Sequence, residues 1–190
     1  MYSAEAPGFI SENHEVLAVV DMVARAVRER GLWVIDRGGD RRNLIVPLLG
    51  RQLRFLIRLI GNRNLLWAGK EVLAREIAQS CPMLYAETIV KIEDGEEKGS
   101  HLEFGYRNVK FPGRRENLGL LVVRGFGQEP MMMLRTQPLR KYRKVLWKLV
   151  RAYIRRWAIE EIIRYIKQRY ELDDVRLLNY RSLQNIMPLI

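Results

Sequence analysis

Residues 32–59 constrain the fold more than any other part of the sequence. The run from Leu32 to Ile35 is apolar and β-prone without polar alternation, which is typical of a central, buried strand. A helix is predicted over residues 40–50, and the alternating apolar side chains of residues 51–59 predict a second strand. A strand, a helix and a strand in this order predict an α/β domain.

Residues 83–136 have a different character. Short β-prone runs alternate with turn signals such as Asp94-Gly95 and Pro112-Gly113, and this pattern predicts an antiparallel sheet inserted into the α/β frame. We therefore divide the chain into a first core part (1–82), a β-rich insertion (83–136) and a C-terminal helical part (137–190).

Helices are predicted on either side of these strands. Residues 12–30 carry valines at three- and four-residue steps, with Ser11 as the N-cap and Gly31 as the end. Residues 139–170 form one strongly basic helical stretch without glycine or proline. Shorter helices are predicted over residues 71–79 and from residue 173 or 174 to residue 186.

The charge of the chain bears on its partners. It has 33 Lys and Arg against 22 Asp and Glu, a formal net charge of +11 and an isoelectric point near 10.1. Such an excess favours a polyanionic partner, either nucleic acid or an acidic membrane surface, over charge that serves solubility alone.

The residue inventory excludes several classes of protein. Cys81 is the single cysteine, which excludes an internal disulfide framework, and with only His14 and His101 there is no Cys/His zinc cluster. Cys81 itself is predicted to be buried or in a turn. No apolar run is long enough for a membrane span and no secretory signal is evident, so we expect a soluble, cytoplasmic protein.

The long basic helix carries one row of candidate binding residues. At roughly 100° per residue, Arg156, Glu160 and Lys167 lie at about −60°, −20° and −40° from Tyr153, and Arg164 lies at about +20°. A separate arc is apolar and is predicted to pack on the core: it holds Ile159, Ile162, Ile163 and Ile166. Helix geometry alone favours a solvated surface on which Arg156, Glu160 and Arg164 form a ladder of ion pairs.

Asp36 also has two interpretations. An aspartate directly after a strand often caps the next helix, and Asp40 could share that role. Alternatively, α/β sheets place catalytic groups beyond the carboxyl ends of their strands. A carboxylate there and a second one on a facing helix could hold divalent metal through hard oxygen ligands and activate a nucleophile.

Taken together, these residues match a known family. The spacing Tyr153-x2-Arg156-x3-Glu160-x6-Lys167 is the Tyr-Arg-Glu-Lys signature of the DDE transposases of the bacterial insertion sequence 4 family. The sequence around it, AYIRRWAIEEIIRYIKQRYELDDVRLLNYRSLQNI, resembles the C-terminal catalytic segment of that family. Upstream, VIDRGGDRRNLIVPLL resembles the segment with the second catalytic aspartate, at the position of Asp36.

The resemblance implies a fold and a chemistry. The fold would be a partial RNase H-like core without its first strand region, with a β-rich insertion ahead of the long signature helix. Asp36 and Glu160 would be catalytic and would ligate Mg²⁺ or Mn²⁺. Tyr153, Arg156 and Lys167 would contact DNA phosphates, with Arg164 beside them on the same face.

The implied reaction is nicking that frees a 3′-hydroxyl, followed by strand transfer. The partners would be double-stranded DNA at inverted-repeat transposon ends and in the target, with no membrane partner. A homodimer on DNA and an association with the nucleoid are both compatible with this role.

One departure from the family pattern limits the expected activity. The first catalytic aspartate of such enzymes lies on the first core strand, and no aspartate before Asp36 fits that role, since Asp21 lies within a predicted helix. We therefore expect this chain by itself to be inactive in cleavage, as a remnant or a part of a larger enzyme. The main alternative is a non-catalytic basic DNA-binding protein derived from a transposase, and a weaker one is a membrane-surface protein.

Overall fold

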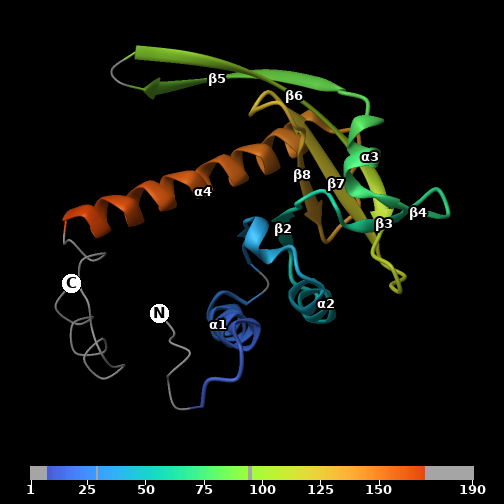
Figure 1. Ribbon diagram of the computed structural model, residues 1–190, viewed down its shortest axis with the longest axis vertical. Coiled ribbons are helices and arrows are strands. Elements are labelled where there is room, and N and C mark those ends of the chain that lie inside the picture. The colour runs from blue at the N-terminus through green and yellow to red at the C-terminus, as the bar shows by residue number, and fades with distance from the viewer. Residues whose placement is uncertain (1–7, 29, 94–95, 170–190) are drawn as a thin grey trace. The chain divides into compact units, whose positions relative to one another are not determined.

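The computed structural model of the chain describes residues 8–28, 30–93 and 96–169 (Figure 1). In these residues the protein is α/β, with one mixed sheet of eight strands. The strands are β1 (Trp33–Ile35), β2 (Phe55–Arg58), β3 (Asn64–Trp67), β4 (Lys70–Leu73), β5 (Tyr85–Glu93), β6 (Glu96–Lys110), β7 (Asn117–Arg124) and β8 (Met131–Arg135).

The helices lie close to the predicted positions. They are α1 (Glu12–Val27), the 3₁₀ helix η1 (Arg37–Gly39), α2 (Arg42–Gly50), α3 (Ala74–Gln79) and α4 (Arg143–Arg169). The Ser11 side chain accepts a hydrogen bond from the His14 backbone N–H, as expected of the N-cap of α1. The predicted helix over residues 71–79 is wrong in its first half, because residues 70–73 form β4. The helix predicted near residues 173–186 lies outside the described residues.

The sheet joins parts of the chain that are far apart in sequence. Its strand order is β1-β2-β8-β7-β6-β3-β4, and β5 pairs with β6 off this path. The pair β1–β2 is parallel, as a strand-helix-strand unit requires, while the other pairs are antiparallel. The strands of residues 83–136 therefore continue the sheet of β1 and β2, through the pair β2–β8, instead of forming a sheet of their own.

The prediction of a central, buried strand at residues 32–35 is wrong. Among the described residues β1 pairs only with β2 and lies at the edge of the sheet, and its three residues are half-buried. Its apolar character has a local explanation on one face, because the side chains of Ile35 and of Leu44 in α2 both lie close to Gly39 of η1. Burial by neighbouring helices and burial by a second strand produce the same apolar pattern in a sequence.

The sheet interior is filled by β2, β7 and β8. Phe55, Leu56 and Ile57 of β2 are fully buried, as are the central residues of β7. β5 and the first half of β6 form a two-stranded ribbon that extends away from the other strands (Figure 1).

The first half of α4 packs on this sheet through one stripe of side chains. Leu146, Leu149, Val150 and Tyr153 follow the i, i+3, i+4, i+7 spacing and are buried, and the Trp147 ring stacks on Phe104 of β6 at 5.7 Å between centroids. Two residues of the apolar arc predicted to pack on the core are exposed, since Ile159 is 57% exposed and Ile162 is 58% exposed. The sheet contacts the arc that contains Tyr153 instead.

The end of α3 is fixed to the sheet by two arginines. Arg107 of β6 donates to the carbonyl oxygen of Ser80 at 3.1 Å, and Arg124 of β7 donates to that of Gln79 at 3.2 Å. These are the last carbonyls of the helix, which lack partners within it. Cys81 follows and is buried, as predicted, and this burial raises the pKa of its thiol while the charges of Arg107 and Arg124 oppose the rise.

Gly105 of β6 allows the backbone that follows α3 to pass close to the strand. Its replacement by alanine is therefore expected to destabilise the protein. A Cβ at position 105 would overlap the carbonyl oxygen of Pro82, so the backbone itself must move. We expect Gly105→Ala to lower the free energy of unfolding by about 1–3 kcal/mol in urea denaturation. Gly99→Ala in the same strand is the control, because its new Cβ would lie 3.8 Å from Cγ2 of Thr88, an ordinary contact. Equal stability of the two variants would contradict this explanation.

The described residues divide into two compact parts: residues 30–153, and a second part that consists of residues 8–28 and the end of α4 from residue 154. In the second part α1 buries Val20, while Val19, Val23 and Val27 of the predicted apolar stripe are exposed. In the described residues no helix combines the length and the apolar character that crossing a membrane requires.

Candidate functional site

The carboxyl edge of the parallel pair β1–β2 brings two predicted features of the sequence together. Ile35 is in register with Ile57, so the next residues, Asp36 and Arg58, leave or end their strands at the same edge of the sheet. This is the edge at which α/β sheets usually bind ligands. The exposed carboxylate of Asp36 and the guanidinium of Arg58 therefore lie at the same ends of two neighbouring strands.

Asp36 has the local role that one of the two interpretations predicted. Its Oδ1 accepts a hydrogen bond of 2.9 Å from the Gly38 backbone N–H and caps η1. Position 39 must be glycine, because a Cβ there would overlap Cγ2 of Ile35. The Gly38-Gly39 turn thus holds the Asp36 carboxylate at the sheet edge, where it is exposed to solvent.

Asp40 is a structural residue. Its side chain is 1% exposed and forms an ion pair with Arg63, whose Nε donates to Oδ1. Oδ2 accepts from the Ile60 backbone N–H at 2.8 Å, and Arg63 also donates to the Asp40 carbonyl oxygen at 2.8 Å. Both carboxylate oxygens are therefore engaged in joining the end of η1 to the β2–β3 connection.

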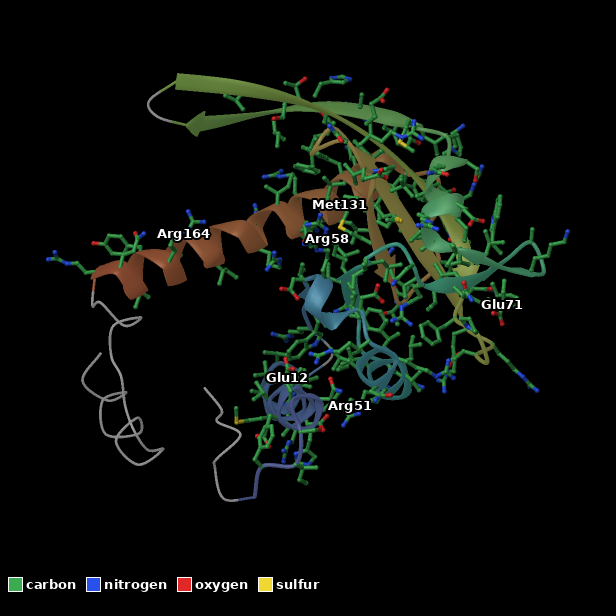
Figure 2. All side chains as sticks on the ribbon, viewed as in Figure 1. Glu12, Arg51, Arg58, Glu71, Met131 and Arg164 are labelled. Atoms are coloured by element: carbon green, nitrogen blue, oxygen red, sulfur yellow. The ribbon has the colours of Figure 1, made fainter. Side chains whose placement is uncertain are left out.

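Tyr153 begins the signature row and lies at the Asp36 edge of the sheet. It is fully buried, and its hydroxyl accepts a hydrogen bond of 3.4 Å from Nη1 of Arg58. The guanidinium of Arg58, which is labelled in Figure 2, also lies 6.0 Å from the centre of the Tyr153 ring. The half-buried Arg58 side chain is more accessible to solvent than the buried Tyr153 side chain. The Tyr153 phenol helps to position the Arg58 guanidinium.

The other predicted residues of the row lie in the half of α4 that belongs to the second compact part. Arg156 is half-buried, and Arg164, which is labelled in Figure 2, is exposed. Glu160 and Lys167 also belong to α4, and their side chains lie outside the described residues. Because α4 is one helix, positions 160 and 167 fall about 20° and 40° from Tyr153 around its axis.

The side chains at this edge can be compared with the ligands that the metal ion implied by the family resemblance requires. Asp36 supplies carboxylate oxygens, which are the ligands that Mg²⁺ and Mn²⁺ prefer, at the sheet edge where such ligands belong. Within the described parts of the chain no three His, Cys, Asp or Glu side chains lie close enough together to hold a metal ion. Of the two predicted carboxylate ligands, the structure describes the side chain of Asp36.

Sequence reasoning missed the roles of Arg58 and Arg63. Each is a cation within or next to an apolar strand-forming segment, and this position in the sequence could have indicated a structural or binding role. A charged side chain in an otherwise buried strand needs a partner or a ligand. In the structure Arg63 has a buried carboxylate as its partner, whereas Arg58 has a phenol.

Comparison with known proteins adds no assignment: neither the family models nor the curated protein sequences contain a significant match to this chain.

Proposed function

We propose that this chain is the DNA-binding and metal-binding part of a cut-and-paste DNA transposase with an RNase H-like core. The observation that carries the proposal is the contact between Tyr153 and Arg58. It attaches the helix with the Tyr-Arg-Glu-Lys spacing to the sheet edge that carries Asp36, and these are the two elements on which the family resemblance rests.

The charge of α4 and its surroundings supports DNA as the partner. The chain has a net charge of +11, and the row on α4 alternates one carboxylate position with arginine and lysine positions. Cations would hold the phosphate backbone while a carboxylate would serve the metal. A metal ligand at Glu160 would give this carboxylate a role in the chemistry, in addition to the ion pairs with neighbouring arginines that helix geometry allows.

Each residue of the row has a proposed role. Arg156, Arg164 and Lys167 would contact phosphates, and Tyr153 would position Arg58 for the same purpose. Asp36 and Glu160 would ligate Mg²⁺ or Mn²⁺, which supplies Lewis-acid activation of water or a 3′-hydroxyl when bound. The cap bond to Gly38 would orient the Asp36 carboxylate toward such an ion.

Replacement of one lysine in the row tests DNA binding directly. We expect Lys167→Ala to weaken binding of the full chain to a duplex and to reduce the slope of log K against log salt by about 0.9, the value of one phosphate contact. The measurement is fluorescence anisotropy with a labelled duplex over a range of salt concentrations.

The matched control for this prediction is Lys148→Ala. Lys148 is exposed on the same helix, about 140° from Tyr153 around the axis, and has the same side chain. Equal losses of slope for both variants would mean that α4 binds DNA through its overall charge, and the assignment of the row would be wrong.

A non-catalytic DNA-binding protein is the second candidate. The observation that favours it is the cap bond of Asp36 to η1, which gives this carboxylate a structural role independent of any metal. This candidate and the transposase share the same basic row, and they differ in whether divalent cations bind at Asp36 and Glu160.

A further inference from the structure

Strand β5 has an open edge along its whole length. It pairs with β6 on one side, and no other strand in the described part of the chain pairs with it. It has nine residues without glycine or proline, whereas β1 and β4, at the two ends of the sheet path, have three and four. Short edge strands and prolines prevent a sheet from pairing with another chain, and β5 has neither protection.

The peptide groups of β5 face this open edge at every second residue. The Ala86 carbonyl oxygen accepts a hydrogen bond of 3.4 Å from Nη2 of Arg143 in α4, which indicates that it is directed away from β6. Successive residues of a strand direct their N–H and C=O groups to opposite sides, so those of Thr88 and Val90 face the same way as those of Ala86. A further strand would pair with these groups.

The two faces of β5 have different surroundings. One face is directed to the start of α4, because Oε1 of Glu87 forms an ion pair with Arg143 at 2.7 Å and Phe104 of the paired strand stacks on Trp147. On the other face Val90 is 60% exposed. The ribbon of β5 and the first half of β6 extends away from the other strands (Figure 1), so its edge is fixed at one end and open beyond it.

The sequence of β5 is complementary to itself. Antiparallel pairing of two β5 strands about a two-fold axis at Ile89 places position 87 of each copy opposite position 91 of the other. Position 87 is glutamate and position 91 is lysine, so an opposite-charge pair forms twice. An axis at the next residue would instead place Glu87 opposite Glu93. A carboxylate can accept from two cations, so Glu87 can keep its ion pair with Arg143.

We propose that the open edge of β5 is a self-association site, at which two copies of this chain join their β5–β6 ribbons into one four-stranded antiparallel sheet. A two-stranded ribbon is marginally stable in water, and further strands stabilise it. The net charge of +11 opposes the approach of two copies, so their contact requires local complementarity of this kind. The inference goes beyond the proposed function, because it involves neither Asp36, Glu160 nor the row on α4.

The test changes the two charges separately and then mixes the variants. Sedimentation velocity of the nucleic-acid-free full chain over a range of concentrations measures the dimer fraction. Two lysines would oppose each other at both ends of the strand pair in Glu87→Lys, and two glutamates would do so in Lys91→Glu. We expect each variant to dimerise about tenfold more weakly than the wild type, since two attractive cross-strand pairs become repulsive. An equimolar mixture should regain dimers, because each lysine then lies opposite a glutamate.

Two further variants separate this edge from the rest of the ribbon. Val90→Pro removes an N–H that faces the open edge, where proline is tolerated, so the fold should persist while dimerisation weakens. Glu103→Lys makes the same charge change as Glu87→Lys at an exposed position of β6, which already has a partner strand on each side. The Glu103→Lys variant should dimerise as the wild type does.

Recovery of dimers in the mixture supports the proposal, because a variant that is only misfolded cannot restore another. A wild-type chain that stays monomeric overturns it. Dimers that none of the variants at positions 87, 90 and 91 weakens belong to another interface and overturn it as well. If Glu87→Lys fails to fold after losing its ion pair with Arg143, Lys91→Glu and Val90→Pro decide the question.

Discussion

Asp40→Ala is expected to lower the free energy of unfolding by about 3–5 kcal/mol, the usual cost of removing one partner of a buried ion pair. The Asp40 carboxylate is 1% exposed and Arg63 is 17% exposed, so the arginine would keep its charge without its partner. The Ile60 backbone N–H would lose its acceptor as well. Chemical denaturation of the full chain, followed by circular dichroism, measures the loss.

Asp36→Ala is the matched control for this prediction. The two aspartates belong to the same short segment, but Asp36 is exposed and loses only the cap bond to Gly38, which costs about 1 kcal/mol. Asp40→Asn separates charge from hydrogen bonding, because the amide oxygen can still accept from Ile60. Losses within about 1 kcal/mol of each other for Asp36→Ala and Asp40→Ala would show that the Asp40–Arg63 pair is not a major determinant of stability.

Glu160→Gln is expected to weaken Mn²⁺ binding to the DNA-bound chain by at least tenfold, and Asp36→Asn by a similar factor. The reason is that each change replaces an anionic oxygen ligand by a neutral one, and even residues that only orient a metal ligand are worth about 10–100-fold in metal affinity. Free Mn²⁺ is measured by electron paramagnetic resonance. Any metal-dependent nicking of plasmid DNA should be lost in both variants, while duplex affinity in the presence of a chelator stays within about twofold.

Glu161→Gln is the matched control, since Glu161 is the next residue of α4 and lies about 100° away around the helix. The transposase proposal expects normal Mn²⁺ affinity for this variant. If Glu160→Gln and Glu161→Gln behave alike, the metal assignment fails and the non-catalytic DNA-binding alternative replaces it.

The sequence by itself determined the features that depend on neighbouring residues. The pattern of residues 32–59 predicted β1, α2 and β2 and therefore the α/β class, which the structure confirms. Ser11 was identified as the N-cap, Cys81 was predicted to be buried or in a turn and is buried, and a long basic helix was predicted where α4 lies. Helical periodicity, capping and strand alternation are encoded within a few residues of each position, so they can be predicted without the fold.

Part of the candidate site could also be predicted from the sequence. The run that ends in Asp36 indicated a carboxylate at the end of a strand, and the structure places it at the carboxyl edge of the parallel pair. Whether Asp36 caps a helix or serves a ligand was left open, and Asp40 was expected to share the capping role. In the structure Asp36 caps η1 and remains exposed, whereas Asp40 is enclosed by Arg63 and Ile60 from a distant segment.

Only the tertiary structure decided which surfaces face each other. The apolar run of β1 predicted a central strand, but its position at the edge depends on which strands pair with it. The buried stripe of α4 ends at Tyr153, whereas Ile159 of the predicted apolar arc is exposed. A helix wheel gives the relative directions of side chains but not the direction of the sheet, and strand pairs such as Leu56 with Arg135 join residues whose local sequences carry no record of each other.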